Sequence, residues 1–269
     1  LGWRWYAPGT RGEVAPAERA GIRLSGWDIQ SAPDFPLFRG FHAAAESMES
    51  VQIFQWMARN RLNMWAYCPR SYHLMKKLGF VLLSGGHILE QVLDPDKPMA
   101  SGKTLFEEHP DWFAQGYTGE PPQMCFTSPG FTHQVVADAR QYFSTGKVER
   151  QAVAAGDFFA LVPMDNATWC RCERCQAQIL ERPTRGYPDT SNDTASNYIF
   201  GFINQVAREV GKTHPDKWLA ALAYSRYVYP PTAEPLEDNV SIMLCLPIRF
   251  TYSAQSQSND RRILQAWTE

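Results

Sequence analysis

Short apolar runs alternate with segments of helical periodicity along most of this chain. The runs contain few polar positions, so they predict strands buried on both faces, as in a parallel sheet. The segments between them repeat apolar residues at helical spacing, which predicts amphipathic helices. The predicted strands lie at residues 38–42, 63–67, 80–84, 158–162, 218–224 and 240–245, and the predicted helices at 51–62, 71–78, 131–143, 197–210 and 261–267.

The order of these elements predicts an α/β fold of repeated strand–helix units. Each unit is roughly 25–35 residues long, the length that a (β/α)8 barrel requires. We therefore expect residues 27–269 to form a truncated TIM-type (β/α)8 barrel with about six of its eight units. Residues 1–26 are interpreted as the end of an earlier part of the protein and a connection to this domain. We expect further domains in the full-length protein.

The composition indicates which classes of binding partner to expect. The formal net charge is −2 and no basic run occurs, so nucleic acid is not an expected partner. No apolar stretch has the length of a transmembrane helix, so we expect no membrane span. The aromatic content is high, with nine Trp and eleven Tyr. Such rings fill cores, and they also serve as stacking platforms in carbohydrate sites.

The stretch DFFALVPMDNATWCRCERC at 157–175 carries the clearest functional signal. Its apolar run predicts a buried strand, and Asp165 and Asn166 follow where that strand passes into a loop. In parallel α/β folds, ligands bind and catalytic residues lie at this end of the strands. Asp-Asn pairs also form turns, and position alone favours neither interpretation.

The same stretch contains three closely spaced thiols, Cys170, Cys172 and Cys175. This spacing is compatible with metal binding, but structural zinc needs a fourth ligand, and no nearby His or Cys is evident in the sequence. A disulfide that braces the loop is the competing interpretation in an exported protein, and we slightly favour it. We expect a structural role for the three thiols and no bound metal or cofactor. The remaining cysteines are interpreted as buried apolar residues.

Six spaced motifs carry a resemblance to a known family. They are LGWRWYAPGTRGEVAP at 1–16, EEHPDWFA at 107–114, MCFTSPG at 124–130, MDNATWCRCERC at 164–175, LAYSRYVYPP at 222–231 and NVSIMLCLPIR at 239–249. Together they resemble the bacterial domain-of-unknown-function 4838 family, which is similar to α-glucuronidase-type glycoside hydrolases. The resemblance implies a hexosaminidase-like α/β domain, with residues 1–26 as its end and linker, before a (β/α)8 barrel. It also implies a carbohydrate-active role on an oligo- or polysaccharide, and a secreted or periplasmic location.

One departure from the family pattern affects the expected chemistry. Relatives often carry an acidic residue in the loop after the strand at 241–245, where this sequence has Leu246-Pro247-Ile248-Arg249. Glycoside hydrolysis usually needs two carboxyl groups that flank the scissile bond. Asp165 is the one carboxylate placed at a strand end, so His87, which follows Gly85-Gly86, is the next acid/base candidate.

Further residues near predicted strand ends are candidates for substrate binding. Arginine can pair bidentately with the carboxylate of an acidic sugar, and aromatic rings can stack on sugars. An ordinary salt bridge or a structural hydrogen bond remains the alternative for each Arg and His. These candidates are Arg39, His42, Trp65, Tyr67, Asn166, Tyr224, Arg226 and Arg249. Two function classes stay open: a glycoside hydrolase that uses Asp165, and a carbohydrate-binding or degenerate barrel without a working acid/base pair.

Overall fold

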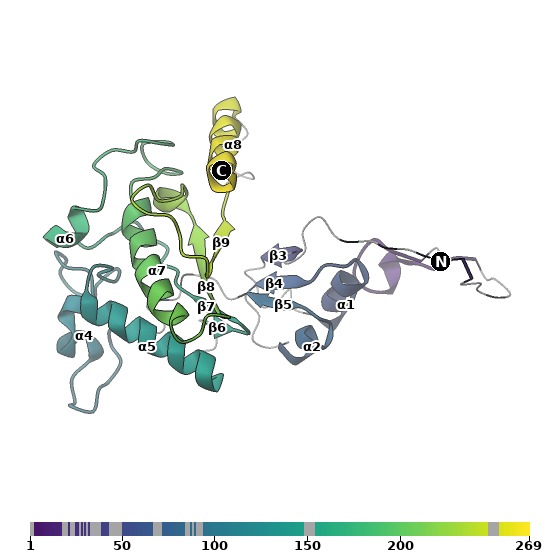
Figure 1. Ribbon diagram of the computed structural model, residues 1–269, viewed down its shortest axis with the longest axis horizontal. Coiled ribbons are helices and arrows are strands. Elements are labelled where there is room, and N and C mark those ends of the chain that lie inside the picture. The colour runs from purple at the N-terminus through teal and green to yellow at the C-terminus, as the bar shows by residue number, and fades with distance from the viewer. Residues whose placement is uncertain are drawn as a thin grey trace. The chain divides into compact units, whose positions relative to one another are not determined.

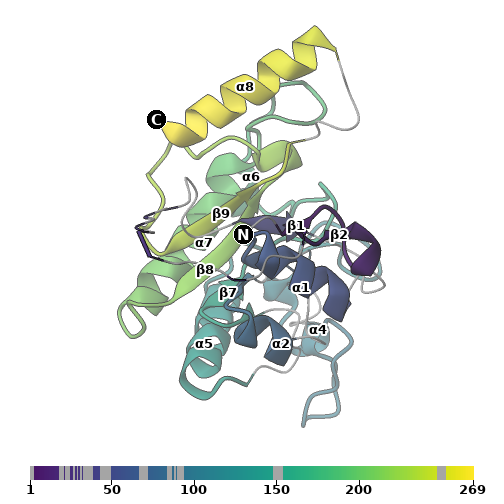
Figure 2. The ribbon, with the colours of Figure 1, turned by 90° about the vertical axis from the view of Figure 1, so that its right-hand side faces the viewer.

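The chain divides into two compact units, residues 1–83 (unit 1) and residues 84–269 (unit 2) (Figures 1 and 2). The division expected from the sequence, between residues 1–26 and 27–269, stays a prediction. The structure is a computed structural model that describes residues 3–17, 21, 25, 26, 28, 30, 32, 39–42, 50–66, 72–83, 87, 89, 94–147, 154–246 and 253–269.

Unit 1 contains a small parallel sheet with the order β3-β4-β5. Its strands are β3 (Gly40–His42), β4 (Met64–Ala66) and β5 (Val81–Leu83), joined by α1 (Val51–Arg59) and α2 (Tyr72–Lys77). The apolar face of α1 points into the core, where the rings of Phe54 and Trp65 meet edge to face at 5.2 Å. A separate antiparallel pair, β1 (Arg4–Trp5) and β2 (Glu13–Val14), flanks the short helix η1 (Thr10–Gly12).

Unit 2 is built on a four-stranded sheet with the order β6-β7-β8-β9. The strands are β6 (Ala154–Ala155), β7 (Phe158–Ala160), β8 (Trp218–Ala223) and β9 (Val240–Leu244). The last three are parallel, with Phe159 opposite Leu219 and Ala221 opposite Ile242. β7 and nearly all of β8 are buried, as their apolar sequences predict.

Two long helices of unit 2, α5 (Pro129–Thr145) and α7 (Ser196–Gly211), pack against each other beside the sheet (Figure 1). Ser128 starts α5, because its hydroxyl accepts a hydrogen bond from the Phe131 amide, and Gly146 ends it in the left-handed conformation. The other helices among the described residues of unit 2 are α4 (Leu105–Glu108), η3 (Pro110–Trp112), α6 (Glu173–Gln176), η4 (Ser225–Tyr227) and α8 (Ala254–Thr268). No helix within the described ranges has the length and apolar character needed to cross a bilayer.

The predicted (β/α)8 barrel is wrong, although each of the six predicted strands is present. In the described part of the chain, these strands lie in two open sheets, β3-β4-β5 and β6-β7-β8-β9, and neither closes on itself. The physical reason is the two-residue strand β6, which pairs antiparallel with β7 through Ala154–Phe159 and Ala155–Phe158. β6 thereby uses the edge of β7 that a preceding parallel barrel strand would need.

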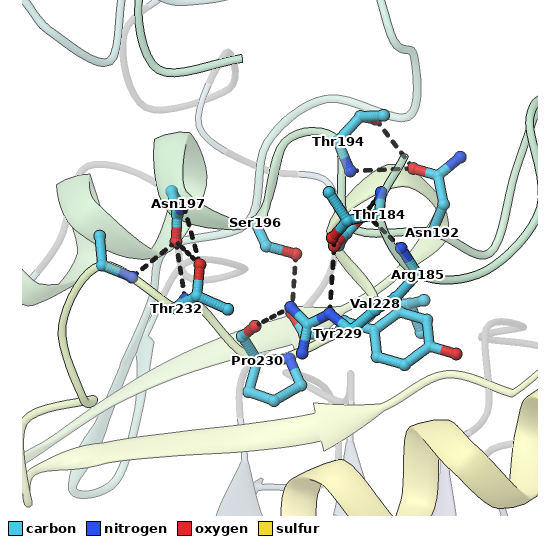
Figure 3. Close-up of polar contacts among 12 residues, drawn as sticks. Thr184, Arg185, Asn192, Thr194, Ser196, Asn197, Val228, Tyr229, Pro230 and Thr232 are labelled. Carbon is cyan, nitrogen blue, oxygen red and sulfur yellow. Dashed lines mark hydrogen bonds and ion pairs between the residues drawn. The ribbon is translucent and has the colours of Figure 1, made fainter. Parts of the chain in front are cut away.

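A buried carboxylate organises the loop that follows α6, and its partner Arg185 ties this loop to the segment that follows β8. Asp193 is 4% exposed, and its oxygens accept hydrogen bonds from the Thr184 hydroxyl, from the amides of Thr184 and Arg185, and from Arg185 Nε at 3.1 Å. Figure 3 shows the Arg185 guanidinium beside Tyr229 and Pro230; it lies 4.8 Å from the Tyr229 ring centroid and donates to the Pro230 carbonyl at 2.7 Å. Nearby, Ser196 donates to the Tyr229 carbonyl, and Asn197 bonds Thr232.

Replacing Asp193 with asparagine is expected to destabilise unit 2 by about 1–3 kcal/mol, because the buried amide cannot accept all four hydrogen bonds. Burial raises the pKa of Asp193, but the hydrogen bonds from Thr184 and Arg185 outweigh burial, so the net shift is downward. The carboxylate's contribution is therefore present above its ordinary pKa of 3.8 and is lost as pH falls through the lowered folded value. Urea unfolding at neutral pH and near pH 3 would measure both effects. The exposed Asp157, in Asp157→Asn, is the matched control, and an equal loss in both variants would contradict this account.

Candidate functional site

The loop after β7 presents Asp165 to solvent on a fixed backbone. Leu161 continues the β7 ladder by donating to the Ala220 carbonyl at 2.8 Å. Beyond it, the buried Gln123 side chain brackets Met164: its Oε1 accepts from the Met164 amide at 3.1 Å, and its Nε2 donates to the Met164 carbonyl at 3.2 Å. The Asp165 side chain that follows is 63% exposed. An exposed carboxylate on an anchored loop is accessible to a substrate.

His87 lies beside this carboxylate. Its Nδ1 is 2.6 Å from the Pro163 carbonyl oxygen, and its Nε2 is 3.6 Å from Asp165 Oδ1. A carbonyl oxygen only accepts, so Nδ1 must carry the proton of this contact. The neutral ring therefore presents an unprotonated Nε2 next to Asp165, and the protonated ring presents an N–H there. The Pro163 carbonyl, in the loop that carries Asp165, thus sets the tautomer of the neutral His87 ring.

Tyr224 completes the group at the end of β8. Its ring centroid is 5.5 Å from that of His87. Burial, followed by the nearby charge of Asp165, raises the pKa of Tyr224 above its ordinary value. A tyrosine kept protonated has an O–H to donate. Asp165, His87 and Tyr224 therefore form a set of three groups able to exchange protons, defined here as the acid–base cluster.

Asn166 and Arg226 lie close in sequence to members of this cluster and are held by hydrogen bonds. The Asn166 side chain donates to the Pro122 carbonyl at 2.8 Å and accepts from the Thr168 amide at 3.0 Å, so it holds the loop in place. The half-buried Arg226 follows Tyr224 in η4, and its carbonyl accepts from the Ala195 amide at 2.8 Å. The Asn166 side chain is thus hydrogen-bonded to backbone groups on both sides of it.

The other candidates from the sequence lie in unit 1 or outside the described residues. Trp65 is 2% exposed against Phe54, so it is a core residue of unit 1 and offers no open ring face for stacking. The Arg39 amide donates to the Asn63 side chain at 2.9 Å, and its Nε donates to the Arg61 carbonyl at 2.9 Å. The His42 side chain, Tyr67 and Arg249 lie outside what the structure describes. A shared cleft with Asp165 stays a prediction for these residues.

Four cysteines converge elsewhere in unit 2. Cys170, Cys172 and Cys175 are joined by Cys125, and all four sulfur atoms lie within 4.8 Å of one another. Cys125 Sγ is 3.9 Å from Cys172 Sγ and 3.6 Å from Cys175 Sγ. All four are free thiols, and only Cys172 is not fully buried. We call Cys125, Cys170, Cys172 and Cys175 the four-cysteine cluster.

The fourth member of the cluster was missed in the sequence because it comes from another segment. Cys125 lies 45 residues before Cys170, in the motif MCFTSPG, and was interpreted as an isolated apolar residue. The antiparallel bridge between Phe113 and Met124 and the cap at Ser128 fix the segment that carries it. The available signal was the presence of cysteine in three of the six family motifs, with Cys125 in one, Cys245 in another and the three closely spaced thiols in the third.

A pocket of about 540 Å³ lies along α5, α6 and α7, lined in part by His133, Arg140, Arg174, Gln205 and Glu209. Its lining includes none of the acid–base cluster. Arg140 is engaged there, since it donates to the Glu209 carbonyl and to Thr213. This pocket therefore does not extend the candidate site around Asp165.

Comparison with known proteins gives one result. The chain matches no curated protein and no solved structure. One family model matches residues 8–269, which is nearly the whole chain and includes both the acid–base and the four-cysteine clusters. The chain therefore belongs to the family described as Domain of unknown function (DUF4838).

Proposed function

We propose that this protein is a carbohydrate-active hydrolase that cleaves a glycosidic bond at the acid–base cluster. The observation that carries the proposal is the 3.6 Å approach of His87 Nε2 to the exposed carboxylate of Asp165. The resemblance of the sequence motifs to glycoside hydrolases supports the choice of substrate class. Catalysis of this kind needs a proton donor and a base or nucleophile within reach of one bond.

Each member of the cluster has a distinct role in this proposal. Asp165 acts as the acid/base group or as the nucleophile, because its carboxylate is the most exposed group of the three. His87 supplies the second proton-transfer group that a carboxylate provides in most glycosidases. In the reaction the bond from the anomeric carbon to the leaving oxygen breaks. The leaving oxygen gains a proton, and a water molecule supplies the hydroxyl group of the product.

Two neighbours suit a sugar substrate. Tyr224 is half-buried and offers an aromatic ring together with a hydroxyl beside Asp165. Arg226, two residues later, has a guanidinium group that can pair with the carboxylate of a uronic or sialic sugar. We therefore favour an acidic glycan over a neutral one as the substrate.

The direct test is a hydrolysis screen with the purified full chain. 4-Nitrophenyl glycosides of neutral and uronic sugars, together with natural acidic oligosaccharides, would be incubated with the wild type and with His87→Asn. Release of nitrophenol or of new reducing ends is expected from the wild type, with a loss of about 10²–10⁴-fold in His87→Asn. His214→Asn is the matched control, because His214 is a half-buried histidine before β8, at the opposite end of that strand from Tyr224.

Equal hydrolysis by the wild type and His87→Asn would point to a contaminating enzyme and remove His87 from the mechanism. Binding of acidic oligosaccharides, seen by calorimetry without any hydrolysis, would replace the enzyme by a carbohydrate-binding protein. If the protein neither binds nor hydrolyses any compound of the panel, this result would contradict the proposal as a whole.

A further inference from the structure

We propose that the four-cysteine cluster binds a single zinc ion as a structural tetrathiolate site. This inference is independent of the hydrolase proposal, since none of the four cysteines belongs to the acid–base cluster. The sequence spacing Cys-x-Cys-x-x-Cys supplies three ligands, and the fold brings Cys125 to them as the fourth. Four thiolates complete the tetrahedral shell that structural zinc requires.

The sulfur separations fit a metal better than a disulfide. Zn–S bonds of about 2.3 Å in tetrahedral geometry place neighbouring sulfur atoms about 3.8 Å apart. The distances from Cys125 Sγ to Cys175 Sγ and to Cys172 Sγ are 3.6 and 3.9 Å. A disulfide holds its two sulfur atoms about 2.05 Å apart, and it would leave the other two thiols unexplained.

The surroundings of the cluster supply donors to the sulfur atoms. The Gln115 amide donates to Cys170 Sγ at 3.3 Å. The fully buried Tyr198 accepts from the Phe126 amide at 3.4 Å, so its own proton is directed to Cys175 Sγ at 3.1 Å. Thr127 Oγ1 lies 3.1 Å from the same sulfur. Hydrogen bonds from outer partners of this kind orient metal ligands and stabilise thiolates.

The position of the cluster indicates a structural role. It joins the segment before α5, which carries Cys125, to the segment after β7, which carries Cys170 and Cys172 and, within α6, Cys175. Tyr198 of α7 contacts both parts, and the ring of Phe126 packs edge-on against it at 5.5 Å. All four coordination positions are taken by protein groups, so no open position remains for a substrate. The ion would fix the loop whose earlier part carries Asp165.

Metal analysis of the full chain, purified without an immobilised-metal column, tests the site. Mass spectrometry of the acid-digested protein is expected to give one zinc per chain in the wild type. Cys125→Ser and Cys172→Ser are expected to lose most of it. Cys245→Ser is the matched control and is expected to keep it, because Cys245 is a free thiol at the end of β9 outside the cluster. Cobalt substitution should add the absorption bands of tetrahedral thiolate coordination.

Other results would overturn the proposal. A metal-free wild type with four reactive cluster thiols would exclude a metal site, and a mass lower by two hydrogens per bond would show disulfides instead. Iron with its thiolate charge-transfer colour would replace zinc with an iron centre. If the serine variants fail to fold, the wild type still decides the matter, because chelation must expose the cluster thiols to a thiol reagent in step with zinc release.

Discussion

Asp165→Asn is expected to lower turnover of the glycoside substrate by about 10²–10⁴-fold, the scale of one acid/base group. The amide keeps the shape of the carboxylate but can neither exchange a proton at neutral pH nor attack an anomeric carbon. Because the Asp165 side chain is 63% exposed, the fold is not expected to depend on its charge. kcat and KM on the best substrate of the screen would be measured together with the melting temperature.

Asp157→Asn is the matched control for this variant. Asp157 stands directly before β7 and Asp165 follows the same strand, so the two carboxylates lie at its opposite ends. Asp157 is exposed and pairs with Lys217 at 2.7 Å, a surface contact that contributes about 0–1 kcal/mol. Full activity is expected in this control. Full activity in Asp165→Asn would remove Asp165 from the mechanism.

The strands were predictable from the sequence, whereas their arrangement was not. Phe158–Ala160 and Trp218–Ala223 are nearly uninterrupted apolar runs, and burial on both faces requires such a composition. Whether parallel strands close into a barrel depends on which edges pair. Here one edge of β7 pairs with β6, and the two alanines of β6 give no indication of a strand in the sequence. Hydrophobic pattern therefore predicted element type, and backbone pairing decided the topology.

Part of the acid–base cluster was predictable for a related reason. Asp165 follows one predicted strand and Tyr224 is the last residue of another. β7 and β8 are hydrogen-bonded parallel neighbours, so their carboxyl ends must lie close together. His87 was chosen for its chemistry and its place after an apolar run, and its contact with Pro163 could not be inferred from spacing. Trp65 shows the opposite outcome, because an aromatic residue within a strand is more often a core residue than a binding platform.

The sequence identified three of the four members of the four-cysteine cluster, because a metal site is defined by positions in space and the fourth ligand comes from a distant segment. Three of its thiols share one short motif, and a motif of that length braced by a disulfide looks the same in sequence as one that binds a metal. The added information is the meeting of Cys125 with that motif in the folded chain. Any inference from cysteine spacing alone therefore had to leave both interpretations open.

Removing the metal from the wild type is expected to lower its melting temperature by about 6–20 °C. Structural zinc in small peptides contributes about 10–16 kcal/mol of binding free energy, which is comparable to the whole stability of a domain. Unit 2 has its own aromatic core around Phe126, Phe131 and Phe202, so we expect a smaller loss of about 3–5 kcal/mol. For a unit of this size, each 1 kcal/mol shifts the melting temperature by about 2–4 °C.

The measurement is a thermal melt of the full chain before and after incubation with a strong chelator, followed by addition of stoichiometric zinc. The melting temperature is expected to fall on chelation and to recover with zinc, because the ion joins the segment at Cys125 to the loop at Cys170–Cys175 and leaves the rest of the core unchanged. Cys245→Ser should respond as the wild type does, and Cys125→Ser should melt low with or without zinc. A wild type that releases its zinc at an unchanged melting temperature would show that the ion binds without holding these two segments together.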